Sequence, residues 1–335
     1  MKTSAIVRII IWSVVAVLLC GVLIAGLSSH FSWSFLENIG LSWSSFRYDE
    51  QGYSIGDFQT DAELHTLNIH WIGGSVHFTI SEDDSVAVEE KSSKPLDEDD
   101  RMRYKVDGGV LTIRARKSGM FFGIGKKLSK DLTVAVPKEL AGKLTQIAAD
   151  CVSASVSLSD MTVQTLQIDT VSGNISIQNS KIGSASFDSV SGRTSISDCT
   201  VDSISCDSTS GSVTCNSVSA NSLEMNSTSG RCKFYGSVKK VNTDTVSGSV
   251  EIDSSTEIER FESDTVSGSV LLRIPDSNGF TAKLDSVSGD FNCNAPVTSS
   301  KSSRTYADGS ANFNFDSVSG DVTIQLVKQE SAGNE

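Results

Sequence analysis

A five-residue phrase returns along the second half of this chain and sets the length of its structural unit. The phrase reads Asp-Ser/Thr-Val/Thr-Ser-Gly, and one copy begins with Asn instead of Asp. Its glycines are Gly173, Gly192, Gly211, Gly230, Gly248, Gly268, Gly289 and Gly320. They are separated by 19, 19, 19, 18, 20, 21 and 31 residues. A period near 20 is typical of repeat architectures, in which each unit is too small to bury its own apolar face and must stack on its neighbours.

Apolar and polar residues alternate on both sides of each phrase. In the first copy Leu166 and Ile168 precede it, and Ile175 and Ile177 follow it. A period of two indicates β-strands, and the glycine between them marks a bend. A further apolar pair three residues apart, such as Val163 and Leu166, predicts a corner or a short third side of each coil. The sequence therefore predicts an all-β protein, a β-solenoid of about 19-residue coils.

A run of nineteen residues without a charge, Ile9–Leu27, lies near the N-terminus. Lys2 and Arg8 precede it, and the next charged residue is Glu37. The run is long enough to cross a bilayer as a helix, and the positive charge before it predicts a cytoplasmic N-terminus. A cleaved signal peptide is the alternative, but the run is longer than a typical signal-peptide core and no clear Ala-x-Ala site follows it. We predict an uncleaved single-pass anchor in the cell membrane, with the bulk of the chain extracytoplasmic.

These features divide the chain into six segments. Residues 1–8 are a cytoplasmic N-terminus and 9–27 a transmembrane helix. Residues 28–60, rich in serine and aromatic residues, are predicted to be a juxtamembrane linker. Residues 61–145 have weaker strand patterns, and we interpret them as an irregular β region that caps the first coil, because an open coil would expose a pairing edge. The repeat solenoid covers 146–326, and a polar tail covers 327–335.

Charge and histidine placement limit the functions that the chain can have. The formal net charge of −13, with no basic cluster to offset it, argues against nucleic-acid binding. All four histidines precede the repeats, and His70 and His77 are interpreted as partly packed strand residues. Arg193 and Arg231 follow two of the phrase glycines but do not by themselves make a site. The sequence therefore predicts no catalytic residue, no metal-ligand set and no cofactor.

The aspartate that opens each phrase is the candidate ligand-binding column. Its members are Asp169, Asp188, Asp207, Asp244, Asp264, Asp285 and Asp316, with Asp150 in a degenerate earlier copy and Asn226 as an interruption. Strand alternation places them on the outer face, where neighbours ~4.8 Å apart repel each other. One interpretation is that each carboxylate accepts hydrogen bonds from the N–H groups of its own Ser-Gly turn. The alternative is a row of weak Ca²⁺ sites, because hard cations take carboxylate oxygens.

Several of these features together resemble a known family. They are the N-terminal span, a first coil with Gly74-Ser75-Val76-His77-Phe78, a strand closing in Val136-Pro137, and units such as Asp316-Ser317-Val318-Ser319-Gly320-Asp321-Val322-Thr323-Ile324. Over about residues 61–326 the chain resembles the bacterial putative-adhesin β-strand-repeat family of unknown function, which includes LiaG-like envelope proteins. The resemblance implies a membrane-anchored extracytoplasmic β-solenoid, and it carries over no catalytic residue.

The resulting hypothesis is a non-enzymatic surface module that binds a partner or has a structural role, as an adhesin or an envelope-stress accessory. The expected partners are the membrane, through the N-terminal helix, and a cell-wall glycan or a membrane protein. The alternative, from another functional class, is a carbohydrate-active β-helix enzyme, a polysaccharide lyase or hydrolase. A cluster of Asp with Arg or Lys on one face would favour the enzyme, whereas a uniform ladder would favour the binding module.

Overall fold

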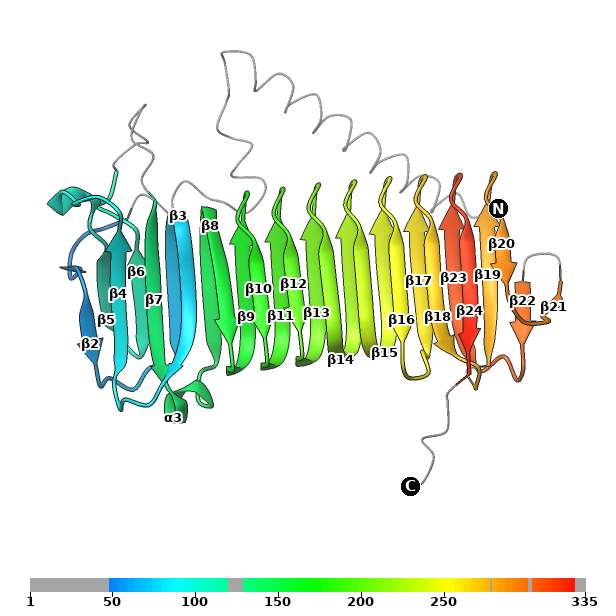
Figure 1. Ribbon diagram of the computed structural model, residues 1–335, viewed down its shortest axis with the longest axis horizontal. Helices are drawn as coiled ribbons and strands as arrows, with labels where there is room; N and C mark the ends of the chain where they lie inside the picture. Colours follow the sequence, from blue (N-terminus) through cyan, green and yellow to red (C-terminus); the bar gives the residue numbers. More distant parts are fainter. Residues whose placement is uncertain (1–47, 120–128, 278, 301–302, 329–335) are drawn as a thin grey trace, which may run out of the picture. The chain divides into compact units, whose positions relative to one another are not determined.

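The computed structural model describes residues 48–119, 129–277, 279–300 and 303–328. The described chain is almost entirely β-strand, with only the 3-10 turn η2 (Glu98–Asp100) and the short helix α3 (Lys138–Ala141) besides (Figure 1). This confirms the all-β prediction. No helix of the described residues is long and apolar enough to span a bilayer. The anchor predicted at 9–27 lies outside the described residues.

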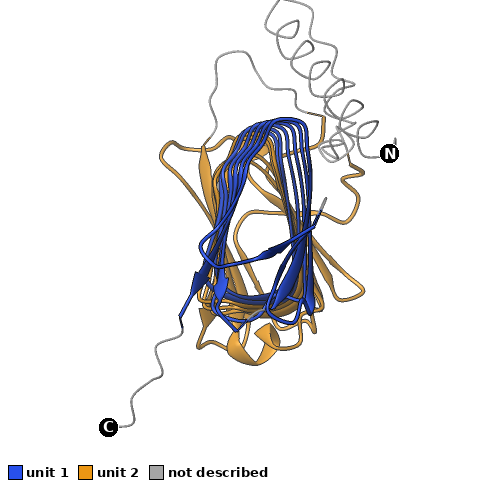
Figure 2. Cartoon of the chain, turned by 90° about the vertical axis from the view of Figure 1, so that its right-hand side faces the viewer, with its two compact units in different colours: residues 1–31, 202–335 blue, residues 32–201 orange. Residues whose placement is uncertain are grey.

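The chain forms two compact units, coloured separately in Figure 2. Of the described residues, the N-terminal unit contains those up to Val201, and the C-terminal unit contains those from Asp202 onward. Strand β13 (Thr200–Ser208) contains the point in the sequence at which the units divide.

The N-terminal unit begins with strands that surround one long strand. The strands are β1 (Ser54–Ile55), β2 (Phe58–Thr60), β3 (Thr66–Ser81), β4 (Val86–Ser92), β5 (Arg103–Asp107), β6 (Val110–Arg114), β7 (Lys130–Pro137) and β8 (Gln146–Ser159). Strand β3 pairs in parallel with β6, β7 and β8. Its register with β8, Leu67 opposite Ile147 and Val76 opposite Val156, shows that β3 is itself a coil of the repeat. Antiparallel strands β1, β2, β4 and β5 lie outside it and give the first coil a paired edge.

Regular coils follow, each made of two strands. They are β9 (Thr162–Thr170) and β10 (Ile175–Gln178), then β11 (Lys181–Ser189) and β12 (Thr194–Ser197). Strand β9 pairs in parallel with β8 and β11, and β10 pairs in parallel with β8 and β12. The short third side expected from the Val163–Leu166 spacing is absent from these described coils. Both residues lie within β9, separated by the two exposed residues Gln164 and Thr165.

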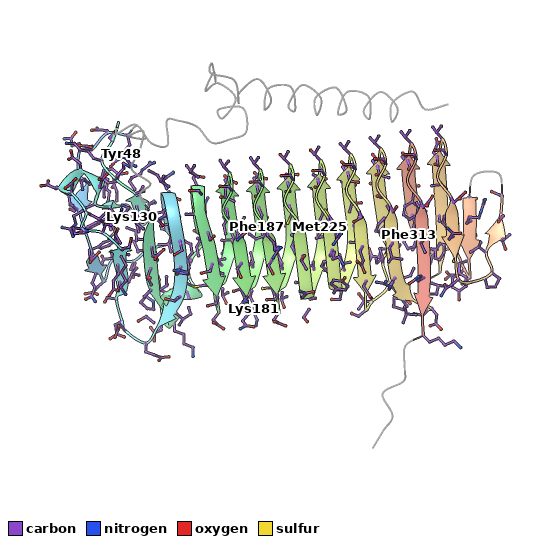
Figure 3. All side chains as sticks on the ribbon, turned by 45° about the horizontal axis from the view of Figure 1, so that its top comes forward. Tyr48, Lys130, Lys181, Phe187, Met225 and Phe313 are labelled. Carbon is purple, nitrogen blue, oxygen red and sulfur yellow. The ribbon has the colours of Figure 1, made fainter. Side chains whose placement is uncertain are left out.

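The apolar residues of both strands point between the two sheets. Leu166 and Ile168 from β9 and Ile175 and Ile177 from β10 are all at most 1% exposed. Figure 3 labels Phe187, which is equally buried in the next coil. Because each strand buries only one of its faces, the period of two read from the sequence describes the core directly.

The C-terminal unit repeats this arrangement with one change in the order of its coils. Its strands after β13 are β14 (Val213–Ser227), β15 (Cys232–Thr245), β16 (Val250–Ser254), β17 (Arg260–Thr265), β18 (Val270–Pro275), β19 (Phe280–Ser286), β20 (Phe291–Cys293), β21 (Thr298–Ser299), β22 (Ser303–Tyr306), β23 (Ala311–Ser317) and β24 (Val322–Val327). The last coil in sequence, β23 and β24, lies between the coil of β17 and β18 and the coil of β19 and β20. The 31-residue spacing from Gly289 to Gly320 therefore contains β20, the second strand of the terminal coil, and the hairpin of β21 and β22.

The phrase glycines are required by a close approach between coils. A Cβ built on Gly192 would lie 1.8 Å from the carbonyl oxygen of Gly173, and one on Gly268 equally close to that of Gly248. No side chain fits at that distance, so the turns of successive coils can stack only through glycine. The second bend uses a different device. Asp160, Asn179, Asp198 and Ser217 all have a positive φ there, a conformation that short polar residues tolerate.

Candidate functional site

Five charged or titratable residues form one row across the N-terminal unit. The strand registers place Arg114 of β6 beside His70 of β3, His70 beside Asp150 of β8, Asp150 beside Asp169 of β9, and Asp169 beside Asp188 of β11. We call these five residues the aspartate row. The parallel registers thus bring together residues that lie up to 118 positions apart along the chain.

The row begins with groups of opposite charge. The Nδ1 atom of His70 lies 2.8 Å from Oδ2 of Asp150, with side-chain exposures of 16% and 29%. At the other side of His70, the guanidinium carbon of Arg114 lies 5.0 Å from the centre of the Tyr48 ring. Burial raises the pKa of Tyr48 to about 12. His70 thus lies between the guanidinium of Arg114 and the first carboxylate of the row.

The middle of the row joins three carboxylates. Burial, and after it the neighbouring charges of Asp188 and Asp150, raise the pKa of Asp169 to about 7, against a hydrogen bond from Gln167. Gln167 Nε2 donates to Oδ2 of Asp169 at 3.0 Å, whereas the buried Oδ1 atom accepts no hydrogen bond within the described structure. Asp169 therefore exchanges its proton near neutral pH, and the row carries less negative charge than three free aspartates would.

The turn N–H groups are occupied by hydroxyls and by carbonyls of the neighbouring coil. The N–H of Gly173 donates to Oγ1 of Thr170 at 2.9 Å, and the same bond recurs at Gly192, Gly211, Gly230, Gly268, Gly289 and Gly320. The N–H groups of Val171 and Ser172 donate to carbonyls of the preceding coil. The interpretation in which each aspartate accepts these turn N–H groups is therefore wrong. Instead, the hydroxyl of the second residue of the phrase accepts the glycine N–H. The sequence signal for this role was that the second residue is always Ser or Thr.

The same column continues in the C-terminal unit with an amide among its carboxylates. In spatial order its members are Asp207, Asn226, Asp244, Asp264, Asp316 and Asp285. Nδ2 of Asn226 donates to Oδ1 of Asp207 at 2.8 Å, so the interruption of the repeat converts a repulsion into a hydrogen bond. Across both units Asp169, Asp188, Asp264 and Asp316 are half-buried, whereas Asp207, Asp244 and Asp285 are exposed.

A second charged cluster lies on the other sheet of the C-terminal unit and was not predicted. Glu251 of β16 accepts from Nζ of Lys233 at 2.7 Å and from the guanidinium of Arg273 at 2.8 Å. Arg273 also donates through Nε to Gln325 of β24 at 3.1 Å. Hydrogen bonds from Lys233 and Arg273 lower the pKa of Glu251 to about 2. We call Lys233, Glu251 and Arg273 the glutamate ladder. Opposite charges at outward positions about one period apart were the sequence signal for it.

A buried ion pair in the N-terminal unit was also missed by the sequence analysis. Lys130 Nζ lies 2.5 Å from Oε1 of Glu90, and both side chains are 2% exposed. The ammonium also donates to the carbonyls of Asp100 and Ala115 and lies 4.8 Å from the Trp71 ring centre. Burial lowers the pKa of Lys130. Every donor of this lysine, which is labelled in Figure 3, is directed at the protein, and the pair joins strands β4 and β7.

The described residues offer no ready-made metal centre. No group of three or more His, Cys, Asp and Glu side chains among them is arranged to hold a metal ion. The Ca²⁺ alternative for the aspartate column thus gains no ligand set there. The six described cysteines are free thiols, and all but Cys293 are buried.

Comparisons with known proteins find one family profile and several solved structures that are similar to this chain. The profile of the Toastrack DUF4097 family matches residues 65–325. Among solved structures, a putative adhesin from Parabacteroides distasonis is 15% identical, with a TM-score of 0.49, and the match covers 83% of this chain and 98% of that one. A putative adhesin from Parabacteroides merdae is 14% identical, with a TM-score of 0.49 and coverages of 83% and 97%.

A protein described as a putative lipid binding protein, also from Parabacteroides distasonis, is 14% identical, with a TM-score of 0.47 and coverages of 84% and 99%. No curated protein matches the chain.

Proposed function

The chain belongs to the Toastrack family (DUF4097), and we propose that it is a non-enzymatic binding and structural module of the cell envelope. Residues 9–27 would tether it to the membrane, with the strands on the extracytoplasmic side. The aspartate row in the N-terminal unit and the aspartates of the C-terminal unit would be its ligand-binding surfaces, and a cell-wall glycan or a membrane protein its partner.

The observation that carries this proposal is the direction in which the reactive side chains point. His77 Nδ1 lies 2.6 Å from Oγ of Ser157 on the neighbouring strand, and His65 Nε2 lies 3.0 Å from the carbonyl of Gly108. His70 contacts Asp150 in the same way. Catalysis requires such groups to converge on a substrate, whereas here they connect one strand to the next. This use of histidine favours a scaffold.

The aspartate row supports binding because it is linear and regular. Carboxylates on consecutive strands repeat every ~4.8 Å, and repeat proteins commonly bind their partners along such extended surfaces. An elongated partner with hydroxyls or positive charges at a similar repeat would meet several carboxylates at once. Each contact would be weak, and the affinity would come from their number.

Thermal unfolding of the full-length chain in detergent tests the binding function. A ligand that binds only the folded state raises the unfolding midpoint by mass action. We expect solubilised cell-wall glycan to raise it, and the double substitution Asp150→Asn and Asp188→Asn to reduce that increase. Asp61→Asn, at an exposed position outside the row, is the matched control. An equal increase in the double variant would remove the row from the proposal.

Protease treatment of intact cells tests the tether. We expect added protease to digest an epitope placed after residue 335 in unlysed spheroplasts. In a separate fractionation without protease, the chain should be found with the membranes. Replacement of Leu18 and Leu19 by Arg should release it from that fraction, because charges at the centre of a span oppose insertion. A protected epitope would contradict the extracytoplasmic location.

One observation favours the glycan-cleaving enzyme as a second candidate. Asp169, with a pKa of about 7, lies between two other carboxylates, and neighbouring strands hold such groups ~4.8 Å apart. Retaining glycosidases use a protonated and an ionised carboxyl group about 5 Å apart. Release of new reducing ends from polysaccharide by the wild-type chain but not by Asp169→Asn would establish this activity. The buried Oδ1 atom of Asp169 counts against it, since a general acid must reach its substrate.

A further inference from the structure

The C-terminal unit ends in a step. Beyond β23, one sheet continues through β19, β22 and β21, because β19 pairs with β23, β22 with β19, and β21 with β22. Beyond β24, the other sheet continues through β20 alone. The first sheet is thus two strands longer than the second, and the hairpin of β21 and β22 extends past the edge of β20 (Figure 1). The change in coil order described above produces this step.

The apolar core is incompletely covered at the step. Phe291 and Cys293 of β20 are half-exposed, whereas the residues that they pair with, Val322 and Ile324 of β24, are at most 1% exposed. Leu284 of β19 is also half-exposed. Val287, at the turn between these two strands, is 79% exposed. This end therefore leaves apolar surface in water, which is unfavourable unless something covers it.

The backbone of β20 has an available edge beside this surface. The carbonyl of Asp290 and the N–H of Asn294 bond to β24. Because successive residues of a strand direct their backbone groups to opposite sides, those of Phe291 and Cys293 point away from β24. Within the described residues, β20 has no other strand partner. It can therefore accept one more strand.

The hairpin has an available edge of the same kind. The N–H of Ser300 bonds to the carbonyl of Ser303, and hydrogen-bonded and non-hydrogen-bonded pairs alternate along an antiparallel ladder. The pair of Ser299 and Arg304 is then a non-hydrogen-bonded one, so the backbone groups of Ser299 point outward. Thr298 and Ser299 are both exposed.

The step also carries little net charge. The whole chain has a formal net charge of −13, but residues 279–307 contain three basic and two acidic residues. Two copies that approach through their steps therefore bring little like charge together.

We propose that the chain forms a twofold end-to-end dimer through this step. A twofold axis parallel to the strands exchanges the two sheets, so the long side of one copy meets the short side of the other. Strand β20 of one copy then pairs antiparallel with β21 of the second copy, twice. Each sheet becomes continuous, the hairpin of each copy covers the half-exposed core residues of the other, and the contact is self-complementary as a closed dimer requires. The proposal does not depend on any ligand.

Cysteine cross-linking tests the proposed pairing directly in the full-length chain. Two differently tagged versions are produced together in a Cys20→Ser background. One keeps Cys293, and the other carries Cys293→Ser with Ser299→Cys. Mild oxidation should yield a mixed, doubly tagged product twice the size of the 35.7 kDa chain. The remaining described cysteines are buried and should not react. A control pair in which both versions carry Cys293→Ser and only one carries Ser299→Cys should yield no mixed product.

Sedimentation of the full-length chain in detergent measures the strength of the contact. Cys293→Pro and Ser299→Pro each remove one outward N–H donor and should raise the dimer dissociation constant at least tenfold. Cys293→Ala and Ser299→Ala keep that donor and are the matched controls. Thermal unfolding confirms that every variant remains folded. A monomeric wild-type chain, or a folded proline pair that dimerises like wild type, would overturn the proposal.

Discussion

The aspartate row and the glutamate ladder have the same strand spacing and opposite electrostatics. In the row, like charges and burial raise the pKa of Asp169 to about 7. In the ladder, two cations lower the pKa of Glu251 to about 2. In a β-solenoid, residues at the same column position of successive coils lie ~4.8 Å apart. At this distance like charges repel each other strongly and opposite charges attract each other strongly. The fold itself favours neither outcome.

The two regions therefore respond to pH in opposite directions. Asp169 has a higher pKa in the folded state than its ordinary value of 3.8, so the folded state binds more protons between pH 4 and 7. Stability falls as pH rises through that window. Glu251 has a lower pKa in the folded state than its ordinary 4.5. Its contribution is present above pH 4.5 and is lost as pH falls towards 2.

Removing the charge of Asp169 should produce the largest effect. Asp169→Asn is expected to raise the free energy of unfolding at pH 8 by ~2–4 kcal/mol and to change it little at pH 4, because the wild-type residue is largely protonated there. Denaturant unfolding at the two pH values measures the difference. Asp61→Asn is the exposed control. An Asp169→Asn variant that is no more stable than wild type at pH 8 would show that the row does not repel.

Adding a carboxylate to the C-terminal unit should reproduce the behaviour of the row there. Asn226→Asp replaces the amide that donates to Asp207 at 2.8 Å and places a carboxylate between Asp207 and Asp244. We expect the free energy of unfolding to fall by ~1–3 kcal/mol at pH 8. The decrease should be smaller at pH 5. Asn216→Asp places the new charge at an exposed position of the same strand, β14, and serves as the comparison. A loss that does not vary with pH would point to packing rather than charge.

Removing the anion of the glutamate ladder should have a smaller effect of opposite sign. Glu251→Gln leaves the cations of Lys233 and Arg273 without the carboxylate that joins them. We expect it to lower the free energy of unfolding by about 1–2 kcal/mol at pH 7. At pH 2 the variant and wild type should converge, because wild-type Glu251 is becoming protonated there. Urea unfolding at both pH values tests this. Glu257→Gln, at an exposed position away from the ladder, is expected to be neutral.

Salt should give the smallest effect and should separate the two regions by sign. Increasing NaCl from 0.1 to 1 M shortens the screening length from about 10 to 3 Å. It should weaken the repulsion that Asp169→Asn removes and the attraction that Glu251→Gln removes. The stability differences of both variants from wild type should therefore shrink, by roughly 0.5 kcal/mol each. A difference that grows with salt would contradict the assigned interaction.

The sequence predicted those parts of the fold that repeat and missed those that occur once. Every coil contains the same alternation, so Leu166, Ile177 and Phe187 could be placed in the core by period alone. The buried pair of Lys130 and Glu90 has no repeat to reveal it, because its residues meet only when β4 folds onto β7. The glutamate ladder is intermediate, since Lys233 and Glu251 occupy equivalent positions but Arg273 reaches Glu251 diagonally.

The sequence by itself determined the coil length, the buried faces and the position of each turn, because these depend on residues that are neighbours along one coil. The tertiary structure alone decided which coil lies beside which. It placed β23 and β24 between the coil of β17 and β18 and the coil of β19 and β20, the histidine of β3 beside the first aspartate, and three carboxylates on consecutive strands. A local period describes the residues of one coil. Pairing between coils depends on contacts between distant parts of the chain, and the period does not specify the order of those contacts.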